Sequence, residues 1–363
     1  MEGTDEATVR AAVESGDSLP GTAGFAGRLD DALVRDVLGR YPLFVESGAA
    51  GGAVPDADWS ADPTELADPD PVPAGHVRDA DGTREVWSLP DPDPFSNPET
   101  AVEAVRDAVE TSIDAVDADG LAIAFSGGVD SALLAARLDA PLYVAGFPDS
   151  HDVEAARSAA ELLGRDLRVV ELTHDAIERA VPGIVAATGR TNAMAVQIAL
   201  PLYLTAERVA ADGFDRLALG QGADELFGGY AKVAKAPEDP RVDADTVRGA
   251  QREVVATLPD QLSRDVLTLR AAGVEPVTPL LHDRVVSAAL RLDDRMLVDG
   301  ETRKWALRQA ALGSLPAAVA MRDKKAAQYG SLAARELDRL ARQAGYKRRM
   351  DDHVTQYVES LVE

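Results

Sequence analysis

The sequence of 363 residues contains no cysteine, and no apolar run is long enough to cross a membrane. The absence of cysteine excludes disulfide bonds, thiolate nucleophiles, Fe–S clusters and cysteine-ligated zinc. The acidic beginning MEGTDEATVR has no apolar segment of the kind found in a secretory signal. We therefore expect a cytoplasmic protein.

Positive charge is scarce. The 37 Lys and Arg residues are opposed by 62 Asp and Glu, the formal net charge is −25, and lysine first occurs at Lys232. Such a charge destabilises a compact state at low salt and aids solubility at high salt. Because the acids are spread along the chain, we expect a halophilic protein adapted to a salt-rich cytoplasm; an acidic surface for a basic partner would predict a local patch. The only basic run is the short KRR at Lys347, which argues against nucleic-acid binding.

Residues 1–95 differ in composition from the rest. They are rich in Gly, Pro and Asp, and their short apolar runs GFAGRL, YPLFVE and REVWSLP predict a few short strands joined by loops. The proline-rich stretch 89–98 is typical of a linker. An amphipathic helix is predicted from Glu99. We therefore expect two regions, 1–95 and 96–363.

Strand and helix patterns alternate after residue 120. The predicted strands are 121–125, 142–145, 167–172 and 216–219, and the predicted helices cover about 130–138, a segment capped by Asp152, 173–188 and 193–211. This alternation predicts an α/β fold, a parallel sheet with helices on both faces, and ligands at the carboxyl ends of its strands. From about Thr246 the chain is predicted to be mostly helical.

The segment LAIAFSGGVDS, residues 121–131, joins the first of these strands to its helix through a glycine-rich turn. Gly127 and Gly128 allow backbone angles that a Cβ forbids and leave room for a ligand beside the main chain. Asp130 and Ser131 favour the start of a helix. Free backbone N–H groups and the helix dipole then make an anion site. No Gly-Lys-Ser/Thr follows, so this is not a Walker loop; the alternative is an ordinary turn.

A second glycine-rich segment, GQGADELFGGY at residues 220–230, follows the fourth predicted strand. It carries the adjacent acids Asp224 and Glu225. Magnesium prefers a few carboxylates together with phosphate oxygens and water. Asp130 and Asp224 therefore form a candidate Mg²⁺ site beside a bound phosphate group. The alternative is that Asp224 caps a helix that begins at ADELFGG.

Both segments resemble sequences of a known family. SGGVDS is similar to the pyrophosphate loop of the N-type ATP pyrophosphatases, and with GQGADELFGGY it resembles the synthetase domain of the asparagine synthetases. GVEPVTPLL, RKWALRQAALGSLP and RDKKAAQYGS extend the resemblance to about residue 331. It implies an adenine-nucleotide α-hydrolase-like fold, the cofactors ATP and Mg²⁺, adenylation of a carboxylate such as aspartate, pyrophosphate release and amination by ammonia.

The resemblance also implies roles for individual residues. Pyrophosphate would be bound by Ser126, Gly127, Gly128, Asp130 and Ser131, and adenosine by Phe125, Ala145, Leu219 and Gly220, partly through backbone groups. Asp130 and Asp224 would bind magnesium. Lys324, or alternatively Lys325, would offset charge on the reacting phosphates, since lysine suits phosphate as a compact charge. Arg303, Lys304 and Arg308 either assist there or lie on a helix surface.

Several positions depart from the family pattern. The chain begins Met1-Glu2-Gly3 and has no cysteine, so it has no N-terminal cysteine nucleophile for glutamine hydrolysis. Residues 1–95 are expected to be a shortened, degenerate glutaminase-like remnant. KKAAQYGS and LSRD favour the short branch of proteins that contain an asparagine-synthetase domain.

The other departures concern the acceptor and the nucleophile. Gln221 replaces a glutamate thought to assist attack on the acyl-adenylate; a glutamine cannot take a proton, although it can orient a nucleophile. Gln197 replaces an arginine of the aspartate-binding stretch, and Val277 and His282 replace a later Arg and Asp. We therefore expect adenylation, with the acceptor left open.

Three functions remain. The first is a ligase that uses free ammonia, and the second is a synthetase subunit that receives ammonia from a separate glutaminase chain. The third is a nucleotide-binding regulatory protein without turnover. Retention of Asp130, Asp224 and Lys324 favours turnover, whereas Gln221 and Gln197 keep the third function open.

Overall fold

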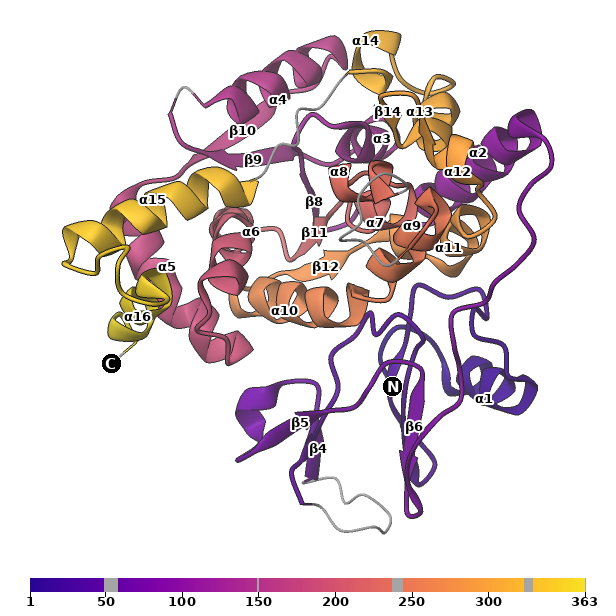
Figure 1. Cartoon of the computed structure of the whole chain (residues 1–363), viewed down its shortest axis with the longest axis horizontal. Helices are drawn as coiled ribbons and strands as arrows, with labels where there is room; N and C mark the ends of the chain where they lie inside the picture. Colours follow the sequence, from indigo (N-terminus) through magenta and orange to yellow (C-terminus); the bar gives the residue numbers. More distant parts are fainter. Residues whose placement is uncertain (49–57, 149, 237–243, 323–328, 363) are drawn as a thin grey trace. The chain divides into compact units, whose positions relative to one another are not determined.

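The computed structural model describes residues 1–48, 58–148, 150–236, 244–322 and 329–362 (Figure 1). The chain forms two compact units, each assembled from three stretches. Unit 1 comprises Met1–Asp117, Gly220–Ser263 and Thr278–Asp323, and unit 2 comprises Ala118–Leu219, Arg264–Val277 and Lys324–Glu363. The compositional change near residue 95 thus lies inside unit 1. Among the described residues, no helix has both the length and the apolar character to span a membrane.

Unit 2 is built on a five-stranded sheet. Its strands are β8 (Leu121–Ala124), β9 (Leu142–Gly146), β10 (Leu167–Glu171), β11 (Arg216–Ala218) and β12 (Glu275–Val277), in the order β10-β9-β8-β11-β12. All pairs are parallel, which confirms the predicted α/β fold. Strand β12 was not predicted, because three residues around Pro276 carry little strand signal. An edge position tolerates that proline.

Helices cover both faces of this sheet (Figure 1). The helices of unit 2 are α3 (Val129–Arg137), α4 (His151–Leu162), α5 (His174–Thr188), α6 (Ala193–Ala211), the C-terminal part of α10 (Leu258–Ala271), α15 (Tyr329–Gln343) and α16 (His353–Ser360). The last two pack on α6. On one face, Ala206 and Val209 of α6 pack with Ala122, Tyr143 and Leu217 of the sheet. On the other, Val153 of α4 packs against Gly146 of β9.

The N-caps of α4 and α5 can be compared with the predicted ones. Thr173 caps α5 as predicted, because its hydroxyl accepts a hydrogen bond from the N–H of Ala176. The prediction that Asp152 caps the preceding helix is wrong: Ser150 caps α4, and Asp152 lies within its first turn. Serine and aspartate are both good N-cap residues, so the sequence alone does not decide between Ser150 and Asp152.

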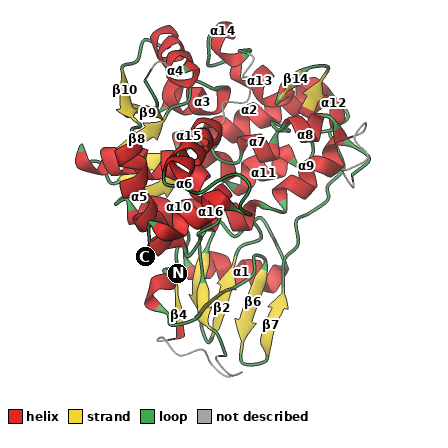
Figure 2. Cartoon of the chain, turned by 60° about the vertical axis from the view of Figure 1, so that its left-hand side comes forward, coloured by secondary structure: helices red, strands yellow, loops and turns green. Residues whose placement is uncertain are grey.

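The N-terminal part of unit 1 contains the predicted short strands (Figure 2). One sheet has the order β1-β2-β6-β7 and the other β4-β3-β5, with β1 Ala26–Leu29, β2 Ala32–Arg35, β3 Phe44–Glu46, β4 Trp59–Ser60, β5 Pro69–Pro71, β6 His76–Asp79 and β7 Gly82–Glu85. Helix α1 (Glu6–Ser15), capped by Asp5, was not predicted. Val9, Phe25, Val77 and Trp87 form a core of this part.

The remainder of unit 1 is helical, as predicted. It contains α2 (Pro98–Asp114), α7 (Ala223–Leu226), α8 (Ala231–Ala234), α9 (Val247–Val255), α11 (Asp283–Ala289), α12 (Asp294–Leu297), α13 (Trp305–Ala311) and α14 (Ala317–Ala320), with the short strands β13 (Val298–Asp299) and β14 (Thr302–Arg303). The stretch before α2 is not a loose linker. Arg248 donates to the carbonyl of Pro92 at 2.8 Å, and Arg252 donates to that of Pro90 at 2.9 Å.

Candidate nucleotide site

In unit 2, the strand order reverses between β8 and β11, which leaves a switch point at the carboxyl ends of these neighbours. Phe125 follows β8, and its N–H donates to the carbonyl of Tyr143 at 2.7 Å; Leu219 follows β11, and its N–H donates to Val277 at 2.9 Å. Both side chains are buried, as is that of Ala145 in β9. These three residues thus form the carboxyl edge mainly through their backbone.

The glycine-rich turn after β8 requires the glycine at its centre. Gly127 has φ +72°, and a Cβ there would lie 2.9 Å from the carbonyl oxygen of Ala155. The Ser131 hydroxyl accepts a hydrogen bond from the N–H of Ser126 at 3.2 Å and donates to the carbonyl of Gly128 at 3.3 Å. The two serines therefore shape the turn itself.

Helix α3 begins at Val129 with Gly128 as its N-cap. Asp130 and Ser131 thus lie in the first turn, and the helix starts one residue before the predicted 130. Within this described turn, the cap makes no side-chain hydrogen bond to the helix. A nine-residue helix with a glycine N-cap presents backbone N–H groups and a positive dipole end to an anion. The turn therefore fits a phosphate group.

The second glycine-rich segment lies in unit 1. Gly222 has φ +90° and is the N-cap of α7, so Asp224 is in the first turn and the interpretation of Asp224 as the cap is wrong. Gly220 and Gln221 precede this cap and are partly exposed. A glycine is needed at 222 because a Cβ there would lie 2.4 Å from Cδ2 of Leu281.

Asp224 forms an ion pair that the sequence did not predict. Its Oδ1 lies 2.8 Å from Nζ of Lys304, whose side chain is 7% exposed, whereas that of Asp224 is 44% exposed. Arg308 is also buried, and it donates to the carbonyls of Ala320 and Arg322. The helix-surface alternative is therefore wrong for Lys304 and Arg308. Arg303 is partly exposed and donates to the carbonyl of Gly229 at 2.6 Å.

Glu225 is a buried acid to which sequence reasoning gave no role. It accepts a hydrogen bond from the Tyr230 hydroxyl. Burial raises the pKa of Glu225, and the neighbouring Asp224 carboxylate also raises it, whereas the bond from Tyr230 lowers it. The sequence did contain a signal for the contact of Glu225 with Tyr230, because two adjacent acids and a tyrosine lie within one glycine-rich segment. The exposed Asp224 and the buried Glu225 thus have different environments.

The residues present fit magnesium bound together with a nucleotide. Among the described residues, no group of three or more His, Asp or Glu side chains is arranged to hold a metal by itself. Magnesium keeps several waters and needs only one or two carboxylates besides phosphate oxygens. Each unit has one candidate carboxylate, Asp130 in the first turn of α3 and Asp224 in the first turn of α7. Lys324 and Lys325 lie outside the described residues.

The positions that depart from the family pattern have ordinary local roles. His282 is the N-cap of α11, and its Nδ1 accepts from the N–H of Arg284 at 3.2 Å. Burial lowers the pKa of His282, and the Arg284 charge lowers it further. Val277 ends β12, and Gln197 is partly exposed on α6 beside Met194, which is 71% exposed. Capping explains why a histidine is accepted at 282.

A family model and individual known proteins match this chain, and all of them point to the same family. The asparagine synthase family model matches residues 102–251 and 236–360. A protein of Methanocaldococcus jannaschii named "Putative asparagine synthetase (glutamine-hydrolyzing) 1" is 29% identical over 281 residues, 67% of this chain and 52% of that protein. Asparagine synthetase B of Escherichia coli is 29% identical over 185 residues, 50% of this chain and 33% of that protein.

A plant relative extends further along the chain. The glutamine-hydrolysing asparagine synthetase of Brassica oleracea is 24% identical over 304 residues, 77% of this chain and 51% of that protein. The chain thus spans about half the length of the Methanocaldococcus and Brassica proteins, and a third of the Escherichia protein. Because the family model matches most of the chain, the protein belongs to the asparagine synthase family.

Proposed function

We propose that this chain is an ATP- and Mg²⁺-dependent carbon–nitrogen ligase that adenylates a carboxylate and transfers the acyl group to ammonia. The observation that carries the proposal is the turn after β8, where Gly127 has φ +72° and Gly128, a residue without a side chain, is the N-cap of α3. This geometry suits the phosphates of ATP, and its place at a switch point suits a nucleotide.

In the proposed reaction, a carboxylate oxygen attacks the α-phosphorus and the bond to pyrophosphate breaks. Ammonia then attacks the acyl carbon, AMP leaves with the electrons of the C–O bond, and the nitrogen loses a proton to form the neutral amide. Ser126, Gly127, Gly128 and Ser131 bind the departing pyrophosphate through backbone and hydroxyl groups. Most of the catalysis then comes from positioning and charge stabilisation.

The charged and polar side chains have separate roles in this proposal. Asp130 and Asp224 would each offer a carboxylate to magnesium, and the ion would supply positive charge against the phosphates. Phe125, Ala145, Leu219 and Gly220 contact adenosine through their backbone. Lys324 offsets charge on the reacting phosphates, and Gln221 orients the attacking amine without accepting its proton.

In this proposal, ammonia reaches the site from outside these 363 residues. They contain no cysteine, and a glutaminase of this kind needs a cysteine nucleophile. We propose free ammonia or a separate glutaminase as its source. A pure preparation should release no glutamate from glutamine.

The deciding experiment is exchange of labelled pyrophosphate into ATP, screened over carboxylic acids. We expect exchange that depends on one class of carboxylate and is abolished in Asp130→Asn and Asp224→Asn. The matched controls are Asp107→Asn on α2 and Asp175→Asn on α5, which remove exposed carboxylates of unit 1 and unit 2. Near-UV circular dichroism checks that each variant is folded.

The outcomes separate the candidate functions. Exchange at the wild-type rate in Asp130→Asn or Asp224→Asn would refute the metal-ligand assignment. Saturable ATP binding without exchange for any carboxylate would instead favour the nucleotide-binding regulatory protein. Exchange with amide formation only when a glutaminase and glutamine are added would identify the two-chain amidotransferase.

A further inference from the structure

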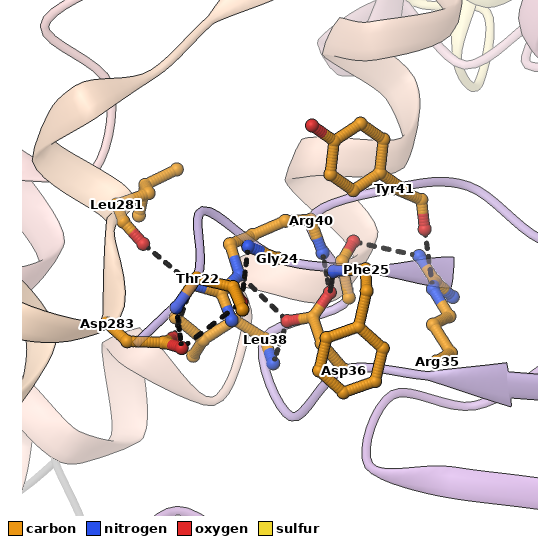
Figure 3. Close-up of polar contacts among 11 residues, drawn as sticks. Thr22, Gly24, Phe25, Arg35, Asp36, Leu38, Arg40, Tyr41, Leu281 and Asp283 are labelled. Carbon is orange, nitrogen blue, oxygen red and sulfur yellow. Dashed lines mark hydrogen bonds and ion pairs between the residues drawn. The ribbon is translucent and has the colours of Figure 1, made fainter. Parts of the chain in front are cut away.

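Three buried charges meet in unit 1 (Figure 3). The Nε of Arg40 donates to Oδ1 of Asp36 at 2.8 Å, and its Nη1 donates to Oδ1 of Asp283 at 2.7 Å. The side chains are 2%, 0% and 1% exposed, respectively. One guanidinium thus lies between two carboxylates that are far apart in the sequence, and all three groups are removed from water.

The cluster fixes the start of α11 through several bonds. Nη1 of Arg40 also donates to the carbonyl of Leu281 at 2.8 Å. The N–H of Thr22 donates to Oδ2 of Asp283 at 2.7 Å, and the N–H of Asp283 donates to the carbonyl of Thr22 at 2.9 Å. Residues 281–283 are therefore held by backbone and side-chain bonds to the N-terminal part of the chain.

Leu281 passes this restraint to the loop of residues 220–230. Its side chain is fully buried, and its Cδ2 occupies the space where a Cβ on Gly222 would lie, at 2.4 Å from that position. Gly222 caps α7, which carries Asp224. At the other end of α7, Nε2 of the buried Gln251 donates to the carbonyl of Leu226 at 2.8 Å. The backbone that carries Asp224 is thus supported at both ends.

Stability alone is a weak reason for three buried charges, because apolar replacements of buried ion pairs are often neutral or stabilising. Their directional bonds do, however, define the position of residues 281–283 closely. We propose that Arg40 is a positioning residue for the loop of residues 220–230, acting through Leu281 on Gly222. Substitution of Arg40 then displaces Asp224 and weakens metal-dependent binding of ATP. This inference rests on the proposed function.

The test compares metal-dependent with metal-free nucleotide binding. The dissociation constant of ATP is measured by calorimetry with and without Mn²⁺, for Arg40→Met, Arg40→Lys and Leu281→Ala. We expect Arg40→Met and Leu281→Ala to raise the Mn²⁺-dependent constant about tenfold, or about 1.4 kcal/mol. Metal-free binding does not involve Asp224 and uses this loop only through the backbone of Gly220, so its dissociation constant should change much less than the Mn²⁺-dependent one. Arg40→Lys should weaken Mn²⁺-dependent binding less than Arg40→Met does. A lysine keeps the positive charge, although it has fewer hydrogen-bond donors than arginine.

The matched control is Val77→Ala, which creates a cavity in the N-terminal core without altering residues 281–283. It should lower the melting temperature and leave both dissociation constants unchanged. An equal weakening in Val77→Ala and Arg40→Met at equal loss of melting temperature would overturn the positioning role.

Three further outcomes are decisive. If Arg40→Met does not fold, Leu281→Ala and Arg40→Lys carry the test, and wild-type constants in both would overturn the inference. If the wild-type protein does not bind ATP with Mn²⁺, the proposed function itself fails. If the wild-type protein binds ATP with Mn²⁺ and the variants bind it equally well, the positioning role of Arg40 is overturned while the proposed function stands.

Discussion

The Nζ of Lys304 lies 2.8 Å from Oδ1 of Asp224, the proposed magnesium ligand of unit 1. Lys304 has a left-handed backbone with φ +57°, which costs a non-glycine residue about 1–2 kcal/mol. Its side chain is nevertheless buried against a carboxylate that is partly exposed. The fold therefore maintains an unfavourable backbone conformation at the residue whose charge neutralises Asp224.

Gly229→Ala should separate this pair. A Cβ at Gly229 would lie 1.9 Å from Oδ1 of Asp224, 2.5 Å from Cε of Lys304 and 2.7 Å from Cα of Asp224, so both side chains and the backbone at Asp224 must move. We expect pyrophosphate exchange to fall about tenfold or more and the free energy of unfolding to fall by about 1–3 kcal/mol. The exchange assay and urea unfolding measure the two effects.

Gly313→Ala is the control for that substitution. The nearest atom to its added Cβ is Nε of Arg106 at 3.3 Å, the far end of a flexible side chain. It should leave exchange near the wild-type rate. Unchanged exchange in Gly229→Ala would show that the ion pair of Lys304 and Asp224 has no role in the reaction.

Asp338 should make unit 2 sensitive to acid. Hydrogen bonds from Arg348 and His353, with the charge of Arg342, hold the pKa of Asp338 down from its ordinary 3.8 to about 2. A depressed pKa adds stability that is complete above the ordinary value and is lost as pH falls from about 4 to 2. Because Arg348 is mostly exposed, we expect only about 1 kcal/mol.

Urea unfolding at pH 6, 4 and 3 tests this contribution. Asp338→Asn should be less stable than the wild type by about 1 kcal/mol at pH 6, with the difference shrinking toward pH 3. Glu161→Gln removes an exposed carboxylate on α4 and should show no such trend. A constant difference between Asp338→Asn and the wild type at all three pH values would contradict the assignment.

The alternation of apolar runs was enough to predict most of unit 2. The predicted helix 193–211 matches α6, and the four predicted strands match β8 to β11 within one or two residues at each end. Strand β12 was missed because its conformation depends on pairing with β11, and no pattern in Glu275–Val277 reports that. Helix α1 lies in an acidic stretch whose apolar side, Val9 and Ala12, is visible only once it packs.

The sequence was enough to predict the glycine turns of the candidate site, but not the contacts between its side chains. The glycines at 127 and 222 occupy positions of positive φ, which a glycine in a motif suggests directly. The pairing of Lys304 with Asp224 joins residues that are 80 positions apart, and it follows from the tertiary fold rather than from spacing. The contact of Arg40 with Asp283 could not be predicted for the same reason, because Asp283 is 243 positions away at the start of α11.

Thermal stability should rise with salt, since the net charge of −25 is carried by a compact chain. Screening shortens the range of repulsion from about 10 Å at 0.1 M to about 3 Å at 1 M. We expect the melting temperature to increase by about 10 °C between 0.1 and 2 M KCl, or about 3–5 kcal/mol for units of this size.

Repeating the measurement near the sequence pI of 4.5 is the control for repulsion. There the net charge is close to zero, so the salt effect should be much smaller. A melting temperature that is independent of KCl at neutral pH would rule out adaptation to salt through this charge.

Free aspartate should be a poor acceptor for this protein. An aspartate site must pair an α-carboxylate while the β-carboxylate attacks, and Gln197 stands where the resemblance places an arginine. Truncating a buried charge-assisted bond costs about 2–5 kcal/mol, or on the order of 30- to several thousand-fold in affinity. Met194, exposed on the preceding turn of α6, adds apolar surface. A larger or less charged carboxylate should therefore be preferred.

Gln197→Arg tests this expectation by restoring a cation. We expect its kcat/KM for aspartate-dependent hydroxamate formation to rise about tenfold or more, with little change for the preferred carboxylate. Ile198→Arg places the same charge one residue along α6, at a side chain that is 37% exposed, and should leave aspartate use unchanged. If the wild-type protein makes asparagine from aspartate and ammonia as efficiently as from its best acceptor, the loss of the arginine does not exclude aspartate. The protein would then be an asparagine synthetase in substrate as well as in family, with another group pairing the α-carboxylate.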